Sequence, residues 1–390
     1  MDFQLSEEQR IIIDTASRVG ARFGLDYWRE QDNKKEFPQA AWTAFCQAGF
    51  AGLALPEAHG GSGLGMLEVA LVIEALSGAG GGATLAQLFM INPIFGGVPL
   101  ARFGTPAQKT TMLPALIQGR MNFCMALTEP DAGSNSLAVR SFAHPDGDGW
   151  RLNGRKIWIT AVPDAQKMLV IARTRKLEEV SRRTDGISMF MIDVARDGLT
   201  HQGIEKVGTN TLAASLVFFD DVLVARDELI GTLDKGWHEL LEVLNTERIV
   251  TTAGLVGAGK LAIRLAVDYA KERRVFGDRP VASYQGLQFP LAQAYAELQC
   301  ARLMNLQAAV LCDTDQPYGS EANQAKLIAA QAAAHAIERS MQTMGGMGYA
   351  KESHLERLWR DARLFRFAPV SEEMVLNYIA THDLGMPRSY

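Results

Sequence analysis

The sequence predicts a mainly helical protein with a β domain in its middle, and three observations carry this prediction. Residues 1–122 place apolar side chains at helical spacing. Residues 123–235 contain short β-rich runs that are separated by polar turns, and residues 236–390 return to long segments rich in Ala and Leu. Helices and strands segregated in this order indicate three domains, for which 390 residues are sufficient.

The first domain is expected to begin with a helix. Ser6 and Gln9 have the spacing of a capping box, in which each side chain accepts a hydrogen bond from the backbone of the other. Further helical patterns lie at 40–53 and 67–76, and Gly-rich loops are expected at 60–65 and 78–82.

The second domain is expected to contain several short strands. Trp150–Thr160 is interpreted as a hairpin, because Asn153-Gly154 is a favourable two-residue turn. The other expected strands are Met168–Arg173, Ile187–Val194 and Ser215–Phe219, and helices are expected from residue 236 to about residue 380.

The composition excludes several classes of function. A net charge of −5 provides no general attraction to nucleic acid or to anionic membranes, and no apolar run approaches the length of a membrane span. The four cysteines form no Cys-x-x-Cys pair and the seven histidines show no ligand spacing, so neither a disulfide framework nor a metal site is expected. The acidic start from Met1 matches no signal or transit peptide, and a cytoplasmic location is expected.

Two glycine motifs resemble nucleotide sites but lack the required context. Gly254–Lys260 nearly completes a phosphate-binding P-loop, but Leu261 replaces the hydroxyl residue that would hold magnesium, and the segment lies in a helical pattern. Gly78–Ala83 has the spacing of a dinucleotide fingerprint, but a helix rather than a strand is expected before it.

The most informative segments are Met125–Asn135 and Lys156–Thr160. Thr128 offers a short hydrogen-bonding side chain, and Gly133 allows a close approach of backbone to a ligand. Trp158 provides a wide apolar face that can stack on a planar ring. These groups fit either a large planar, polar ligand or a plain polar turn beside a core Trp.

The order of these residues resembles the flavin-binding signature of the acyl-CoA dehydrogenase family. Arg273–Gly277, Gln342–Tyr349 and Trp359–Arg363 are similar to further family motifs, so the resemblance runs nearly from end to end. Alone, the first would be a cationic helix end and the second a helix stop. The resemblance implies an N-terminal helical domain, a central β-barrel and a C-terminal four-helix bundle.

The resemblance also implies an FAD site and assigns residues to it. Five positions, Arg273, Phe276, Gln285, Gln342 and Gly346, would hold the distal half of the cofactor, partly across a subunit interface. The full expected set is Met125, Leu127, Thr128, Gly133, Ser134, Trp158, Thr160, Arg273, Phe276, Gln285, Gln342, Gly345, Gly346, Ser371 and Glu373.

The implied reaction is α,β-dehydrogenation of an acyl-CoA thioester, which needs a carboxylate base in a dry cleft. Many relatives carry this Glu near the C-terminus, where Pro369 stands here and cannot act as a base. Other relatives, such as isovaleryl-CoA dehydrogenase, carry it on an earlier helix directly before an Arg. Glu247-Arg248 matches that second location, and its distance of 273 − 248 = 25 residues from Arg273 agrees with those relatives. Glu247 is therefore the expected base, although an exposed helical ion pair would be its ordinary interpretation.

The expected substrate contacts include two departures from the family. Pro369 has no N–H to hold the thioester oxygen, and Asn245 stands where many relatives carry Asp. By resemblance, Leu85–Pro99 would line the floor of the acyl pocket. The expected substrate residues are Ser134, Asn245, Arg248, Ala368 and Pro369.

Electron-transfer flavoprotein is the expected electron acceptor, and a homotetramer or dimer is the expected assembly. Three alternatives on the same fold stay open: an enoyl-CoA reductase running the site backwards, a flavin monooxygenase or oxidase, and a binding protein without catalysis.

Overall fold

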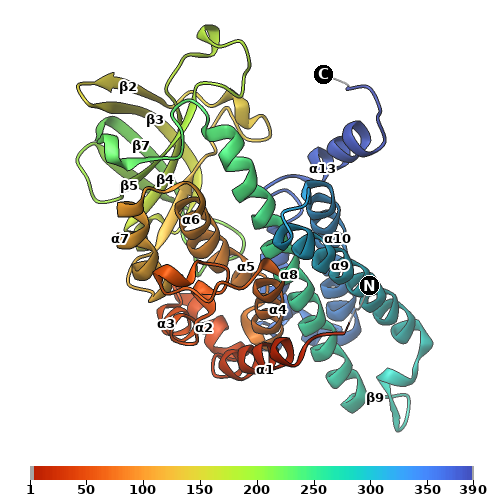
Figure 1. Ribbon diagram of the computed structural model, residues 1–390. Coiled ribbons are helices and arrows are strands. Elements are labelled where there is room, and N and C mark those ends of the chain that lie inside the picture. Colours follow the sequence, from red (N-terminus) through yellow and green to blue (C-terminus); the bar gives the residue numbers. More distant parts are fainter. Residues whose placement is uncertain (1–3, 389–390) are drawn as a thin grey trace.

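The computed structural model describes residues 4–388, so Met1–Phe3 of the expected helical start lie outside the described chain. Helices come first, a sheet follows, and a second helical region ends the chain (Figure 1). The N-terminal helices are α1 (Glu7–Ala21), α2 (Leu25–Lys34), α3 (Gln39–Gln47), α4 (Met66–Leu76), α5 (Thr84–Phe89), α6 (Val98–Phe103) and α7 (Pro106–Ile117).

The predicted capping box at the start of α1 is confirmed. The Ser6 hydroxyl accepts from the backbone N–H of Gln9 at 3.1 Å, and the Gln9 side chain accepts from the backbone N–H of Ser6 at 3.0 Å. These bonds satisfy two of the N–H groups that a helix start leaves unpaired.

One of the two expected glycine loops is not a loop. The chain is irregular at 60–65, as predicted, but Ser77–Gly81 forms a π-helical turn that continues α4. Gly80 has φ +152°, a conformation that only glycine adopts without strain. The helix that precedes this motif excludes the dinucleotide fingerprint, as expected from the sequence.

The central strands form one mixed sheet in the order β6-β7-β3-β2-β4-β5-β8, and β1 pairs in parallel with β4. Within residues 4–388 the edge strands β6 and β8 are not paired with each other, so the expected closed β-barrel is unconfirmed. The strands are β1 (Phe123–Ala126), β2 (Phe142–Asp146), β3 (Gly149–Thr160), β4 (Lys167–Arg173), β5 (Ile187–Asp193), β6 (Leu199–Ile204), β7 (Ala214–Val224) and β8 (Leu229–Ile230).

The predicted hairpin at Trp150–Thr160 is wrong. This segment is a single strand, β3, and the hairpin turn lies before it, between Asp146 and Gly149. The register with β7 shifts between Leu152 and Gly154. Glycine is required at 154, because its φ is +149° and a Cβ there would lie 2.3 Å from the Ser141 hydroxyl oxygen. The Asn-Gly pair therefore produces a bulge within a strand instead of a turn.

Strand β4 is buried on both of its faces. Met168 and Val170 pack into one apolar cluster of the sheet, while Leu169 and Ile171 pack into another cluster that includes side chains of α7. Successive side chains alternate between faces, which explains why this strand is apolar throughout.

Helix α8 (Gly236–Glu272) extends from the sheet to the opposite tip of the molecule, where β9 lies (Figure 1). Gly254 and Gly257 of the P-loop-like motif lie inside this helix. Their missing side chains allow close packing, since a Cβ at Gly257 would lie 2.4 Å from the Glu74 carbonyl oxygen. The remaining elements are β9 (Arg274–Val275), β10 (Arg279–Pro280), α9 (Gln285–Asp313), α10 (Gly319–Met344), α11 (Gly346–Tyr349), α12 (Leu355–Leu364) and α13 (Glu372–Tyr378).

The prediction that no apolar run approaches the length of a membrane span is not confirmed, because two helical stretches are long and apolar enough to cross a membrane by length and composition. These are Thr84–Phe103 and Gly236–Glu272, and 94% and 83% of their most apolar windows are buried inside the protein. Such burial is typical of the core helices of a soluble protein.

Candidate active site

A buried ion pair anchors the segment that follows β1. Lys156 Nζ lies 2.9 Å from Glu129 Oε1 and donates to the Leu127 carbonyl oxygen at 2.8 Å, and its side chain is fully buried. Glu129 also accepts backbone N–H bonds from Arg140 and Ser141 at 2.7 and 2.8 Å. Burial lowers the pKa of Lys156 to about 8. The pair fixes the backbone around Leu127 and Thr128.

Trp158 projects from a second bulge in β3, between Lys156 and Ile159. Its backbone is left-handed at φ +63°, and 54% of its side chain is exposed. The N–H of Ile157 donates to the Thr128 carbonyl oxygen at 2.9 Å, so the two predicted segments lie together. The bulge turns an aromatic ring outward beside Thr128, where a planar ligand can reach it.

The expected base, Glu247, lies inside the protein and is only 1% exposed. Its Oε1 accepts a hydrogen bond from the Thr251 hydroxyl, and its Oε2 is buried without a partner within residues 4–388. Burial raises the pKa of Glu247, although the Thr251 hydrogen bond and the cations Arg248 and Lys326 oppose this effect. The ordinary interpretation of an exposed ion pair is therefore wrong.

Arg248 and Asn245 lie on the same side of α8. Arg248 Nη1 donates to Asn245 Oδ1 at 2.5 Å and to the Leu244 carbonyl oxygen at 3.2 Å. The Nε atom of Arg248 is buried without a partner among the described residues. A buried donor of this kind is costly unless a ligand or a water molecule satisfies it.

The turn between α12 and α13 contains Ala368 and Pro369, whose peptide bond is cis. Lys326 of α10 donates to the Val370 carbonyl oxygen in this turn at 2.6 Å. Ser371 caps α13 by accepting from the N–H of Met374 at 3.3 Å. Glu373 lies exposed in the first turn of α13. No carboxylate occupies Phe367–Val370. Glu247 and Glu372 are both buried, and Glu372 pairs with Arg366 at 2.6 Å, whereas Glu247 has no ion pair within residues 4–388.

The distal set of predicted residues lies away from Glu247. Arg273 follows the last residue of α8, and 26 residues of helix place it about 40 Å from Glu247. Phe276, at φ +49°, is 93% exposed. No ion pair of Arg273 occurs in the described part of the chain. The other exposed members of this set are Gln285 at the start of α9, Gln342 near the end of α10, and Gly345 and Gly346 at the α10–α11 junction.

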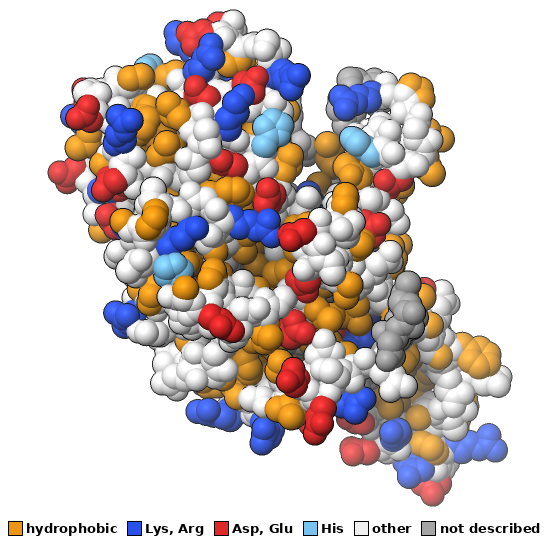
Figure 2. Space-filling model, viewed as in Figure 1, with side chains coloured by type: hydrophobic (Ala, Val, Ile, Leu, Met, Phe, Trp, Pro, Cys, Tyr) orange, Lys and Arg blue, Asp and Glu red, His pale blue; other side chains and the backbone are white. Residues whose placement is uncertain are grey.

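The predicted residues therefore lie in two separate groups, which are not close together within one chain. The first contains the β1–β3 residues Met125, Leu127, Thr128, Trp158 and Thr160. Met125 packs against the same apolar cluster as Leu244 of α8, which brings this group toward the helix that carries Glu247. Figure 2 shows a notch between the sheet and the α13 segment, with hydrophobic side chains along it.

The predicted acyl-pocket segment Leu85–Pro99 is buried except at Val98, and its role stays a prediction.

The exposed groups fit a large planar cofactor that carries phosphates. Trp158 and Phe276 expose aromatic rings, and Arg273 offers a fork that suits a diphosphate. A Cβ added at Gly133, Gly345 or Gly346 would meet no atom within 4 Å, so their backbones stand open to a ligand. Ser134 lies exposed beside Gly133.

The roles of Lys156, Thr251 and Lys326 were not predicted from the sequence. Lys326 carried a signal, because it interrupts the Ala-rich apolar face of α10 formed by Ala322, Ala325, Ala329 and Ala330, and a lysine on such a face is rarely buried without a reason. Lys156 and Thr251 look like ordinary polar residues in sequence, and their roles depend on partners that only the fold brings together.

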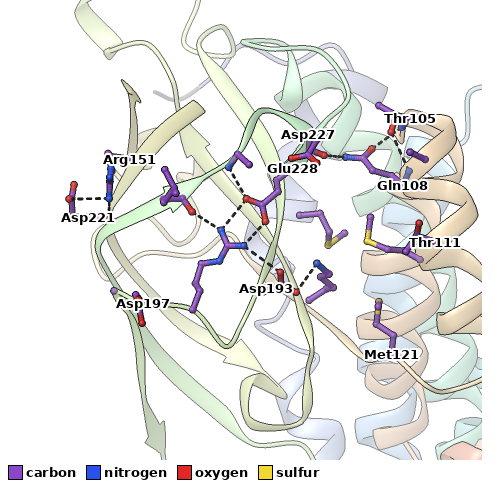
Figure 3. A pocket seen from close by; sticks show the side chains of 18 of the residues that line it. Thr105, Gln108, Thr111, Met121, Arg151, Asp193, Asp197, Asp221, Asp227 and Glu228 are labelled. Atoms are coloured by element: carbon purple, nitrogen blue, oxygen red, sulfur yellow. Dashed lines mark hydrogen bonds and ion pairs between the residues drawn. The ribbon is translucent and has the colours of Figure 1, made fainter. Parts of the chain in front are cut away.

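A large open pocket of about 1120 Å³ lies elsewhere, between α7 and the sheet (Figure 3). Its lining is crossed by ion pairs, including Arg196–Glu228 at 2.5 Å and Arg151–Asp221 at 3.5 Å. None of the predicted flavin or substrate residues lines this pocket. No cluster of three or more potential metal ligands occurs within residues 4–388.

Models of the acyl-CoA dehydrogenase N-terminal, middle and C-terminal domains match residues 6–120, 124–222 and 234–383 of the chain. The chain belongs to the acyl-CoA dehydrogenase family. It is 37% identical to acyl-CoA dehydrogenase FadE12 of Mycobacterium tuberculosis, and the match covers 99% of this chain and 98% of FadE12.

Two further relatives of this chain are informative. The chain is 33% identical to the 3-(aryl)acrylate reductase of Clostridium sporogenes over 91% of its own length and 93% of the reductase. Butyryl-CoA dehydrogenase from Megasphaera elsdenii has the same fold, with a TM-score of 0.92, 28% identity, and coverage of 98% of this chain and 100% of that chain. Membership in the acyl-CoA dehydrogenase family thus extends over the whole chain.

Proposed function

We propose that this protein catalyses the FAD-dependent α,β-dehydrogenation of an acyl-CoA thioester to the trans-2-enoyl-CoA, with Glu247 as the base. The environment of Glu247 carries the proposal. Its side chain is buried, burial raises its pKa, and its Oε2 has no partner in the described chain. The activities of FadE12 and of the butyryl-CoA dehydrogenase, as their names give them, support the same reaction class.

In this mechanism the two carboxylate oxygens of Glu247 have different tasks. Oε1 is held by Thr251, so the side chain has a fixed orientation, and Oε2 takes the α-proton as the C–H bond breaks. Burial keeps water away and increases the affinity of the carboxylate for that proton. When bound, FAD supplies the acceptor for the hydride that leaves the β-carbon. The residues that would hold it are the two groups described above, with Trp158 in one and Arg273 in the other.

The test is an anaerobic titration of the purified flavoprotein with saturated acyl-CoAs of increasing chain length, followed by flavin absorbance. We expect bleaching by one chain class, and we expect Glu247→Gln to keep its flavin but lose bleaching. Glu242→Gln is the matched control, because Glu242 lies on the same helix and pairs with Arg102 at the surface at 2.7 Å. Bleaching that persists in Glu247→Gln would remove this residue from the mechanism.

The same preparation distinguishes the alternatives. The 3-(aryl)acrylate reductase relative supports an enoyl-CoA reductase as one alternative. In such an enzyme, an enoyl thioester would reoxidise chemically reduced flavin, and saturated thioesters would cause no bleaching. A monooxygenase or oxidase would reoxidise it rapidly with oxygen. A protein purified without flavin would be a binding protein that only keeps the fold.

We further propose that the protein assembles into a homotetramer or dimer whose copies share each flavin. Arg273 and Phe276 lie at the end of α8 that is remote from Glu247, so a second chain would bring them to the site. Exposed apolar residues support an interface at this end: Phe276 is 93% exposed, Tyr349 84% and Phe289 61%. Sedimentation velocity of the flavin-loaded protein tests the assembly.

The remaining proposals are electron-transfer flavoprotein as the acceptor, a cytoplasmic location, and domains 1–122, 123–235 and 236–390. Family membership supports the acceptor, which reduction of purified electron-transfer flavoprotein would test. The family matches at 6–120, 124–222 and 234–383 support the boundaries, which limited proteolysis would test. Four free cysteines support a reducing compartment, which cell fractionation would test.

A further inference from the structure

A buried lysine near Glu247 has no part in the mechanism described so far. Lys326 lies on the inner face of α10 and is fully buried, although lysine is among the residues least often buried without a partner. Its neighbours on the same face are Ala322, Ala325, Ala329 and Ala330. Placing an ammonium group there is costly unless hydrogen bonds and charges offset the loss of water.

The lysine holds a specific turn. Its Nζ donates to the Val370 carbonyl oxygen at 2.6 Å, in the turn that contains Ala368 and Pro369. Arg366, just before the turn, makes hydrogen bonds of 2.6 and 2.9 Å to Glu372, just after it. Lys326 therefore links α10 to the turn that contains the expected substrate residues Ala368 and Pro369.

The charged groups that face Lys326 come from two elements. Glu247 and Arg248 lie on α8, and Glu372 and Glu373 lie on α13. Among residues 4–388 none of these carboxylates forms an ion pair with Lys326, and its ammonium group donates to the neutral Val370 carbonyl oxygen. Glu372 also interacts with Lys326 but already has Arg366 as an ion-pair partner, whereas Glu247 has no ion pair within residues 4–388.

We propose that Lys326 is a positioning residue for the dehydrogenation described above: it fixes the Phe367–Ser371 turn against α10 and faces Glu247 as a buried counter-charge. Because the cation favours the ionised carboxylate, removing it makes Glu247 harder to ionise. The inference rests on the proposed function for the meaning of the turn, but the electrostatic link between Lys326 and Glu247 can be measured without any substrate.

The experiment compares Lys326→Met, Lys326→Gln and Lys326→Arg in the full-length flavoprotein. The protonated Glu247 carboxyl is followed by infrared difference spectroscopy against pH, and its band is assigned by its loss in Glu247→Gln. We expect the midpoint to rise by about one pH unit in Lys326→Met and Lys326→Gln, and to return near the wild-type value in Lys326→Arg. Lys260→Met is the control. Lys260 lies on α8 and pairs at 2.7 Å with Glu74 of α4, so its loss should leave the Glu247 midpoint unchanged.

Two readouts separate the two tasks of the lysine. Gln can still donate to the Val370 carbonyl, so Lys326→Gln should keep the wild-type KM while Lys326→Met raises it several-fold. An unchanged Glu247 midpoint in a folded Lys326→Met or Lys326→Gln protein overturns the proposal, and Lys326→Gln decides the question if Lys326→Met does not fold. A wild-type protein that no acyl-CoA bleaches would instead overturn the proposed function, whatever the carboxyl titration gives.

Discussion

The Thr251 hydroxyl donates a hydrogen bond to Glu247 Oε1 from one helical turn further along α8, and Glu247 Oε2 is left without a partner in the described chain. An i,i+4 contact of this kind holds one carboxylate oxygen and leaves the other available. The hydrogen bond lowers the pKa of Glu247, whereas burial, the larger effect, raises it. Activity that requires ionised Glu247 should therefore be lost as pH falls through a value above that of an exposed Glu, about 4.3.

Thr251→Val should move this acid limb to higher pH. The variant loses the bond that favours the ionised carboxylate, so the pKa of Glu247 rises and turnover falls at low pH but recovers at high pH. The measurement is the pH profile of kcat/KM. Thr252→Val is the matched control: the neighbouring hydroxyl is buried with no partner among residues 4–388, so its removal should leave the profile in place. Equal profiles for both variants would contradict the assigned role.

Lys156→Met should destabilise the protein by about 3–5 kcal/mol, because it leaves Glu129 buried without its cation. Denaturant unfolding measures the change. Lys167→Met is the control, since Lys167 pairs at 2.7 Å with Asp193, whose side chain is half exposed, and should cost less than about 1 kcal/mol. The prediction is wrong if the two variants lose similar stability.

Trp158→Ala should reduce flavin retention far more than stability. The ring is already 54% exposed, so its removal should cost about 1 kcal/mol in the flavin-free protein. Trp150→Ala is the contrasting variant, because Trp150 is 8% exposed and packs 5.1 Å from the Phe190 ring, and it should cost about 3–5 kcal/mol. Flavin absorbance per chain and denaturant unfolding give the two numbers for each variant. Full flavin content in Trp158→Ala would exclude the stacking role.

Phe276→Asp should weaken assembly by about tenfold or more without unfolding the chain, because this side chain is 93% exposed and lies at the expected interface. Val207→Asp is the control, at 66% exposure in the loop between β6 and β7. Sedimentation velocity at several protein concentrations measures both variants. If Phe276→Asp dissociates no more readily than Val207→Asp, the interface lies elsewhere.

Periodicity and family motifs predicted the helix–sheet–helix order, the strand at Met168–Arg173 and the capping box at Ser6. The errors have local causes. Asn153-Gly154 has the composition of a hairpin turn, but the long pairing of β3 with β7 outweighs that preference and converts it into a bulge. Gly78–Gly82 has the composition of a loop, but Gly78–Gly81 packs near α8 and continues the helix as a π-helical turn.

The site was predictable only where the sequence itself carries the signal. Glu247 was predicted as the base from its position before Arg248, and that role stays a prediction, but the sequence carries no sign of its burial. Thr251 acts through its contact with Glu247, and Lys326 acts through its contact with Val370. The second contact joins residues that are 44 positions apart in the sequence. Sequence patterns do not reveal such pairs without the fold.

The length of α8 has a genetic consequence. One chain carries Glu247 near the start of this helix and Arg273 at its end, so in a shared site each chain lends its base to one centre and its arginine to another. Two inactive variants, Glu247→Gln and Arg273→Ala, should then complement each other when they are refolded or expressed together. In random mixtures about a quarter of the centres would combine an intact half from each parent and regain full activity.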